Sequence, residues 1–219
     1  MLRLVCGNLN YSSWSMRPWL ALKHAQLPFK TFDVGLRTAD GWKDKILSFS
    51  GAGKVPVLVD GSLSVHESLA ICEYVAELAP AAKLWPEDPH LRARGRAIAC
   101  EMHSGFSALR QSLTTNLRAR APGRAHQAEV AADIARVLDI FRASLSTAKG
   151  RFLLGEFSIA DCMFFPVVTR FRTYGVPLPE DAAAYSAALF ELPFVQELEA
   201  LAEVAPAIPE YDAALRVSG

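Results

Sequence analysis

The sequence predicts an α/β domain followed by an all-helical domain. Short apolar runs rich in β-branched residues alternate with helical patterns in the first third of the chain. Residues 84–89, with two prolines and two acidic residues, then interrupt this alternation. Every long apolar pattern beyond them has helical spacing. We therefore expect an α/β domain over residues 1–80, a linker over 81–89 and an all-α domain over 90–219.

Composition and charge limit the classes of function. Of the 219 residues, 51% are hydrophobic and 21% are charged, which is typical of a folded globular protein. Basic and acidic residues both number 23, so the formal net charge of zero offers no general field for nucleic acid. The sequence shows neither a signal peptide nor an apolar run of the roughly 20 residues that cross a bilayer. We expect a cytoplasmic protein that binds neither nucleic acid nor membrane.

The four cysteines are far apart in the sequence and have apolar neighbours. This spacing fits neither a disulfide framework nor a zinc cluster, so we expect buried, reduced thiols and no metal site. Cys100 and His103 lie three residues apart on a predicted helix, but no second pair of ligands accompanies them.

The N-terminal patterns have a recognisable order. We predict a strand at residues 2–6, a helix through 19–27, a strand at 29–34, a helix at 40–49, two strands within 54–65 and a helix through 66–75. Asp60 and Gly61 are predicted as the tight turn between the paired strands, because both residue types tolerate positive φ. This βαβ then ββα order is that of a thioredoxin-like unit.

Three hydroxyls, on Ser12, Ser13 and Ser15, lie where the first strand passes into the first helix. The free N–H groups and the positive dipole end of a helix start stabilise an anion. Pro18 fits the first turn, where its missing N–H is not needed. The alternative interpretation is that one serine merely caps the helix.

Two further features point to the same side of the predicted sheet. Val55 precedes Pro56 at the start of a strand, and it can present its backbone to a peptide, above all if the peptide bond between them is cis. Glu67 and Ser68 open the helix after the hairpin, where a serine either caps the helix or binds an anion. Together with the serines, these features would hold a small anionic peptide.

The rest of the chain is predicted to be helical. Apolar positions run along one side of residues 91–117, and a second helix at 124–147 should pack against this segment as an antiparallel hairpin. Ser158 and Asp161 have the spacing of a capping box and begin a helix that is apolar on most faces, which we expect at the centre of the domain. Shorter helices are predicted at 179–192 and 193–204.

With these motifs the chain resembles the cytosolic glutathione transferases over nearly its whole length. Four features carry the resemblance: Ser12-Ser13-Trp14-Ser15-Met16-Arg17, Lys54-Val55-Pro56-Val57-Leu58, Glu67-Ser68 and Ser158-Ile159-Ala160-Asp161. The first motif is most similar to the serine classes, the zeta and tau types and related bacterial proteins. The resemblance implies a detoxifying homodimer that transfers glutathione to a small, mostly apolar electrophile.

The resemblance also implies roles for individual residues. Ser12 would donate a hydrogen bond to the glutathione sulfur, with Ser13 and Ser15 as alternatives that the sequence does not separate. Lowering a thiol pKa from ~8.5 by roughly two units takes about 2.7 kcal/mol, the size of one charge-assisted hydrogen bond plus a helix dipole. Lys54, with Lys43 as a second candidate, would neutralise the glycyl carboxylate. The implied glutathione-binding set is Trp14, Lys54, Val55, Pro56, Glu67 and Ser68.

Two alternative functions stay open. Zeta-type maleylacetoacetate isomerases carry a cysteine in place of Trp14 and a β-branched residue in place of Pro18, so these positions speak against a glutathione-dependent cis-trans isomerase. A catalytically silent binding or scaffold protein with the same fold is the other alternative. The electrophile is expected between the domains, beside a long helix through residues 101–110, with three candidate contacts: Met102, Phe106 and Leu109.

Overall fold

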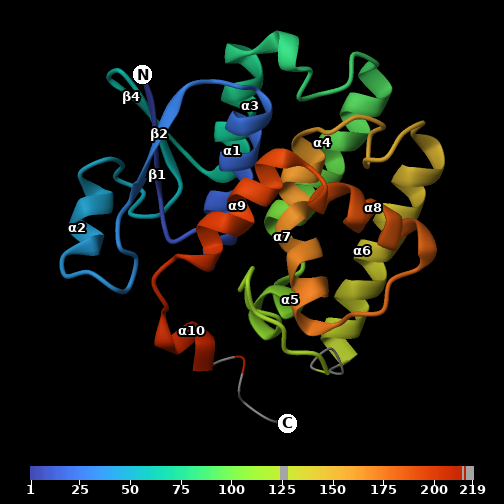
Figure 1. Cartoon of the computed structure of the whole chain (residues 1–219). Coiled ribbons are helices and arrows are strands. Elements are labelled where there is room, and N and C mark those ends of the chain that lie inside the picture. The colour runs from blue at the N-terminus through green and yellow to red at the C-terminus, as the bar shows by residue number, and fades with distance from the viewer. Residues whose placement is uncertain (124–127, 214, 216–219) are drawn as a thin grey trace.

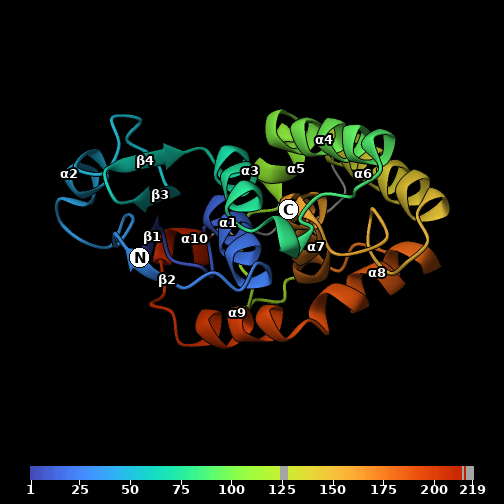
Figure 2. The ribbon, with the colours of Figure 1, turned by 90° about the horizontal axis from the view of Figure 1, so that it is seen from above.

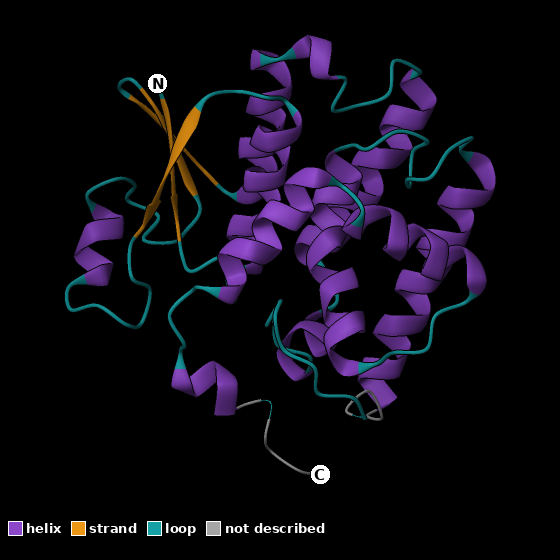
Figure 3. Cartoon of the chain, viewed as in Figure 1, coloured by secondary structure: helices purple, strands orange, loops and turns teal. Residues whose placement is uncertain are grey.

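The computed structural model describes residues 1–123, 128–213 and 215. A four-stranded sheet with its helices forms the N-terminal part, and the rest of the described chain is helical (Figures 1 and 3). The predicted order, an α/β unit followed by an all-helical domain, is therefore confirmed. No helix in this described part is long and apolar enough to cross a membrane.

The sheet has the strand order β2-β1-β3-β4. Strand β1 (Leu2–Cys6) pairs in parallel with β2 (Phe29–Asp33) and antiparallel with β3 (Val57–Asp60), and β3 pairs antiparallel with β4 (Leu63–His66). Apart from the exposed Arg3, the residues of β1 are buried, and the apolar residues of both central strands, β1 and β3, are buried on both faces, which helices cover.

Helices cover the two faces of the sheet unequally. Helices α1 (Ser13–His24) and α3 (Ser68–Leu78) pack together on one face, and the short α2 (Trp42–Leu47) lies on the other (Figure 1). Leu4 points into the first layer and Val5 into the second, as the alternation of a strand requires. A 3-10 turn, η1 (Pro80–Ala82), follows α3.

The hairpin turn lies one residue further along the chain than predicted. Asp60 pairs with Leu63 inside the ladder, so the loop residues are Gly61, with φ +57°, and Ser62. The Asp60 carboxylate accepts a hydrogen bond of 2.9 Å from the Tyr74 hydroxyl of α3. This contact fixes Asp60 at the end of β3, which local turn preferences do not reveal.

Helix α7 (Ile159–Tyr174) is the centre of the second domain, and all its residues except Arg172 are buried. The predicted capping box at its start is confirmed, since the Asp161 carboxylate accepts the Ser158 N–H at 2.8 Å. Around α7 lie α4 (Pro89–Ser104), α5 (Ser107–Ser112), α6 (Ala128–Thr147), α8 (Glu180–Phe190) and α9 (Pro193–Glu203), and α10 (Pro209–Ala213) follows α9.

Helix α1 joins the two domains. It contacts α7 on one side and α9 on another (Figure 2). Lys23 pairs with Glu197 of α9 at 2.5 Å. One continuous set of buried apolar side chains runs from β1 through α1 into the second domain. Helix α1 is therefore held by both halves of the chain.

The prediction of a single long helix through residues 101–110 is wrong. Helix α4 ends at Ser104 and α5 begins at Ser107, because Gly105 is extended and Phe106 has a φ of +57°. The Leu109 N–H, freed by this break, donates to the Asp133 carboxylate of α6 at 2.9 Å. The antiparallel arrangement of α4 and α6 is confirmed, since Leu91 lies near Thr147 and Glu101 pairs with Arg136. Residues 124–127, where the second helix was predicted to begin, are outside the described residues.

Candidate active site

Two neighbouring cavities lie at the starts of α1 and α3, and three residues line both: Trp14, Lys54 and Val55. The first cavity has a volume of about 340 Å³ and is lined by Trp14, Ala52, Lys54, Val55, Pro56, His66, Glu67, Ser68 and His103. All six residues predicted to bind glutathione are in this set. The Val55–Pro56 peptide bond is cis.

The start of α3 gives the first cavity an anion-binding end. Ser68 is the first residue of the helix, is 1% exposed and has an Oγ without a hydrogen-bond partner. A buried, unpartnered hydroxyl beside free helix N–H groups suits a carboxylate. Glu67 precedes it with a φ of +70°, and its carboxylate lies 3.4 Å from His103 Nε2. Burial lowers the pKa of His103 below its usual value, although Glu67 acts in the other direction.

The three candidate serines have different surroundings. Ser12 is the N-cap residue of α1, but its side chain makes no capping hydrogen bond; its Oγ donates to Ser15 Oγ at 2.8 Å. Ser15 is fully buried, lines neither cavity and accepts the Gly7 N–H at 3.2 Å. Ser12 and Ser13 both line the second cavity. The simple capping role is therefore excluded for the Ser12 hydroxyl.

The second cavity, of about 390 Å³, is cationic, whereas an apolar surface was expected for the electrophile. Arg37, Lys54, Arg110 and Arg170 line it, and none of the described residues that line it is acidic. The remaining lining residues are Tyr11, Ser12, Ser13, Trp14, Leu36, Trp42, Ile46, Gly53, Val55, Thr114, Thr115 and Tyr211.

Met102, Phe106 and Leu109, the expected contacts of the electrophile, are buried in the core and line neither cavity, whereas Arg110, which follows them on α5, lines the second cavity. Lys43 is exposed on α2 and also lines neither cavity.

One of the arginines that line the second cavity, Arg170, is buried, whereas Arg110 is half-buried and Arg37 is exposed. Arg170, 4% exposed, donates from Nε to Leu113 O at 2.7 Å and from Nη2 to Ser13 Oγ at 3.4 Å. Burial, together with Arg110, lowers the pKa of Arg170 to about 10. Arg110 Nε and Thr115 Oγ1 are buried without a partner. This wall therefore carries positive charge and free hydrogen-bonding groups.

Trp14 lines both cavities, and its ring contacts cations on α1 and α5. The guanidinium carbons of Arg17 and Arg110 lie 4.0 Å and 5.4 Å from its ring centroid, and the His103 ring meets it edge-on at 5.2 Å. Arg17 is fully buried, which lowers its pKa to about 9, and its two terminal nitrogens have no hydrogen-bond partner.

Sequence reasoning missed Arg110, Thr115, Arg170 and His103 as site residues. Arg170 could have been found from the sequence. A charged residue in a helix that is apolar on most faces is expected either to have a buried hydrogen-bonding partner or to line a site. Of the cysteines, Cys6, Cys72 and Cys162 are buried as expected, but Cys100 is exposed, because it lies on the outer side of α4. Within residues 1–123, 128–213 and 215, no group of three or more His, Cys, Asp or Glu residues is arranged to hold a metal ion.

Comparisons with known proteins cover both halves of the chain. The glutathione S-transferase N-terminal domain family matches residues 11–78, and the C-terminal domain family matches residues 124–205. A protein named probable maleylacetoacetate isomerase, from Caenorhabditis elegans, is 40% identical over 97 residues, which are 44% of either chain. Glutathione S-transferase hmp2 from Hypomyces subiculosus is 30% identical over 169 residues, 73% of this chain and 79% of its own.

Solved structures show the same fold. A glutathione transferase homolog from Burkholderia gl BGR1, solved with bound glutathione, matches with a TM-score of 0.71 at 22% identity, over 92% of this chain and 97% of that one. The two family matches together span most of this chain, in the order of its two domains. The chain therefore belongs to the glutathione S-transferase family, which confirms the predicted family and, with it, a glutathione-dependent enzyme, while the likeness to the zeta and tau types stays a prediction.

Proposed function

We propose that this transferase binds glutathione in the first cavity and stabilises its thiolate with the Ser12 hydroxyl for attack on a small electrophile. The observation that carries the proposal is the convergence of six predicted glutathione-binding residues on one cavity, next to a serine whose hydroxyl does not cap its helix. A scaffold protein has no need of such a peptide-sized site.

Each part of glutathione has a complementary group. The γ-glutamyl carboxylate meets the unpartnered Ser68 hydroxyl and the N-terminus of α3, and its ammonium meets the Glu67 carboxylate. The cysteinyl backbone pairs with Val55, next to the cis peptide bond. The glycyl carboxylate is neutralised by Lys54. This orientation brings the sulfur to Trp14, at the boundary between the cavities.

The surroundings of the serines favour Ser12 as the donor. Ser15 lies behind it and lines neither cavity, whereas the Ser13 hydroxyl, whose oxygen accepts from Arg170, keeps its own proton and is the alternative donor that the variants below compare. Since Ser15 Oγ accepts the Gly7 N–H, its own hydrogen can turn toward Ser12 when Ser12 donates to sulfur. Ser12 thus keeps an acceptor role toward Ser15 and directs its proton at the thiolate, beside the positive end of α1.

The electrophile is proposed to carry a carboxylate or a similar anionic group. Among the described residues, four cationic side chains and no acidic one line the second cavity, and a guanidinium is well suited to bind a carboxylate. An apolar body fits against Leu36, Trp42 and Ile46, which line the same cavity. This proposal narrows the mostly apolar electrophile predicted from the sequence to one with an anionic end.

A second candidate function is glutathione-dependent cis-trans isomerisation of an unsaturated acid. The cationic second cavity favours it, and the Caenorhabditis elegans relative is named probable maleylacetoacetate isomerase. The thiolate would add to one carbon of the double bond, the resulting single bond would rotate, and expulsion of the thiolate would restore the double bond and return glutathione unchanged. Trp14, in place of the cysteine of the zeta-type enzymes, is the feature that separates this chain from them.

The test compares Ser12→Ala with Ser13→Ala. At a pH where most of the bound thiol is protonated, Ser12→Ala should lower turnover about a hundredfold, which corresponds to about two units of thiol pKa, while glutathione affinity by calorimetry stays within about threefold. Ser13→Ala should retain most of the turnover. Full activity in Ser12→Ala would exclude Ser12 as the donor, and failure of the unaltered protein to bind millimolar glutathione would favour the scaffold alternative.

We further propose that the protein acts as a cytoplasmic homodimer, with domain boundaries at residues 80 and 90. Membership of the family supports the assembly and the location. Light scattering of the purified protein measures its mass, and a mass of one chain would refute the dimer.

A further inference from the structure

The loop that carries Ser12, residues 7–12, is held by segments from the far end of the chain. The Asn8 side chain donates to Pro206 O at 2.8 Å, and its own backbone carbonyl accepts the Ser12 N–H at 2.8 Å. The loop is therefore in direct contact with the segment that leads into α10.

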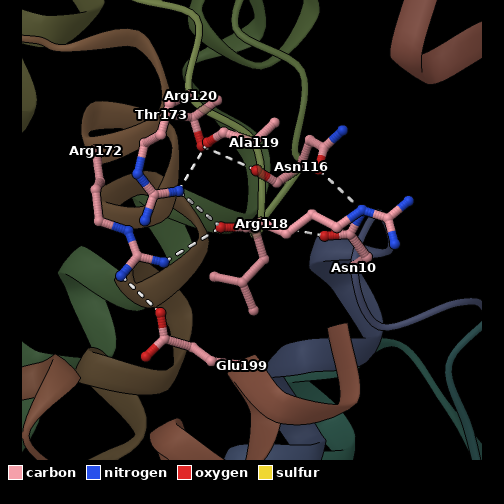
Figure 4. A network of polar contacts seen from close by, with 9 residues as sticks. Asn10, Asn116, Arg118, Ala119, Arg120, Arg172, Thr173 and Glu199 are labelled. Carbon is pink, nitrogen blue, oxygen red and sulfur yellow. Dashed lines mark hydrogen bonds and ion pairs between the residues drawn. The ribbon is translucent and has the colours of Figure 1, made fainter. Parts of the chain in front are cut away.

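Asn10 anchors the middle of this loop to the second domain. Its side chain is fully buried; Oδ1 accepts the Arg118 N–H at 3.0 Å, and Nδ2 donates to Asn116 Oδ1 at 2.9 Å (Figure 4). The Asn10 carbonyl accepts the Leu117 N–H at 3.1 Å. Both polar ends of the side chain and the backbone are thus bonded to residues 116–118.

Tyr11, the neighbour of Ser12, is the point where these contacts meet α10. Its hydroxyl donates to Asp212 Oδ1 at 2.8 Å and accepts from Arg118 Nη2 at 3.1 Å and from the Ile208 N–H at 3.2 Å. Asp212 Oδ1 also accepts from Asn116 Nδ2 at 2.9 Å. One carboxylate oxygen therefore links α10 both to the Ser12 loop and to the segment that anchors it.

The same short helix forms part of the wall of the second cavity. The Tyr211 ring stacks on the Tyr11 ring with 5.4 Å between centroids and 22° between planes, and both residues line the cavity together with Ser12. A ligand in the second cavity therefore contacts Tyr211, which precedes Asp212 directly. The binding of a ligand in the second cavity and the position of Ser12 therefore both depend on the contacts among Tyr11, Tyr211 and Asp212.

We propose that Asp212 is a positioning residue, which holds Tyr11 and thereby fixes Ser12 at hydrogen-bonding distance from the glutathione sulfur. A hydrogen bond weakens steeply with distance and angle, so a small displacement of the loop weakens the stabilisation of the thiolate. The inference rests on the proposed role of Ser12 and assigns a further residue, on α10, to the same step.

The experiment measures the pKa of the enzyme-bound glutathione thiol, from the ultraviolet absorbance of the thiolate at saturating glutathione. Asp212→Ala should raise this pKa by about one unit, and so lower the thiolate fraction about tenfold where most of the thiol is protonated. Glu210→Ala is the matched control, since Glu210 is exposed on the same helix. The control should leave the thiol pKa and turnover unchanged.

Two further variants separate positioning from folding. Tyr11→Phe keeps the ring but removes the hydroxyl, and it should raise the thiol pKa as Asp212→Ala does, with no further rise in the double variant. Asp212→Asn keeps an oxygen that accepts from Tyr11, so its thiol pKa should stay close to that of the unaltered protein. Melting temperatures are measured alongside, because Tyr11→Phe serves as the test if Asp212→Ala does not fold.

The possible results are distinct. An unchanged thiol pKa in Asp212→Ala and Tyr11→Phe overturns the inference, whether or not KM for the electrophile or the melting temperature changes. Additive shifts in the double variant also contradict it. If Ser12→Ala leaves the thiol pKa of the otherwise unaltered protein unchanged, the proposed role of Ser12 fails instead, independently of Asp212.

Discussion

The two cavities of this transferase differ in how the chain builds them. The first is lined by short, contiguous motifs of the N-terminal half, namely residues 54–56 and 66–68, with single contributions from Trp14, Ala52 and His103. The second collects residues from segments as distant as Tyr11, Arg110, Arg170 and Tyr211. The first contains groups suited to one fixed tripeptide, whereas the second can change its specificity by substitutions in several independent segments.

The largest expected effect concerns the charge of the second cavity. Arg110→Met should lower kcat/KM about a hundredfold for an electrophile with a carboxylate, since a hydrogen bond to a charged group is lost. The uncharged amide of the same electrophile should be affected less than about threefold. Lys43→Met, on the exposed side of α2, is the control. Equal losses for the acid and the amide would show that the cavity does not select by charge.

The break between α4 and α5 precedes Arg110 in the chain. The strain that a side chain at this break would cause can be measured as a loss of stability. A Cβ at Gly105 would lie 2.7 Å from the backbone oxygen of Glu101, so Gly105→Ala should destabilise the fold by ~2 kcal/mol. Gly51→Ala is the matched control, because nothing lies within 4 Å of a Cβ at Gly51. Denaturant unfolding measures both, and equal stabilities would contradict the strain assigned to Gly105.

A smaller effect is expected in the first cavity. Ser68→Ala removes the unpartnered hydroxyl at the start of α3, so it should weaken glutathione binding about tenfold. Ser62→Ala in the exposed hairpin turn should leave the Kd unchanged. Calorimetry at constant pH gives both values. An unchanged Kd in Ser68→Ala would mean that the γ-glutamyl carboxylate binds elsewhere.

The smallest effect is a pH dependence of glutathione affinity. His103 faces Glu67, Arg17, Arg110 and the Trp14 ring, and burial keeps its pKa below the usual value, so it is neutral at pH 7. As the pH falls through this lowered pKa, protonated His103 should compete with the glutathione ammonium for Glu67 and weaken binding a few-fold. His103→Gln should reduce this loss. An unchanged acid limb in that variant would show that another group titrates there.

Local signals explain how much of the protein could be predicted from sequence. Strand β1, the capping box of α7 and the motifs around Pro56 and Ser68 each depend on a few adjacent residues, and all were predicted. The break at Gly105 was missed, because one glycine is a weak signal and the Asp133 carboxylate that stabilises it lies in another helix. The hairpin turn was predicted one residue too early, because local turn preferences do not reveal that Asp60 bonds to Tyr74 of α3.

The second cavity shows where sequence reasoning stopped. Met102, Phe106 and Leu109 were expected to contact the electrophile because they are apolar and helical in spacing, a pattern shared by any core helix. The residues that line the cavity were not predictable as a group, since only the folded chain brings Arg110, Arg170 and Tyr211 together. The three serines were predicted as a set, and only their surroundings in the fold distinguish Ser12.

The most direct test of the central claim is a crystal structure of the unaltered protein with glutathione. It should show glutathione in the first cavity, with its sulfur within about 3.5 Å of Ser12 Oγ and its γ-glutamyl carboxylate on Ser68 and the start of α3. A sulfur bonded instead to Ser13, or glutathione bound outside the first cavity, would contradict the account.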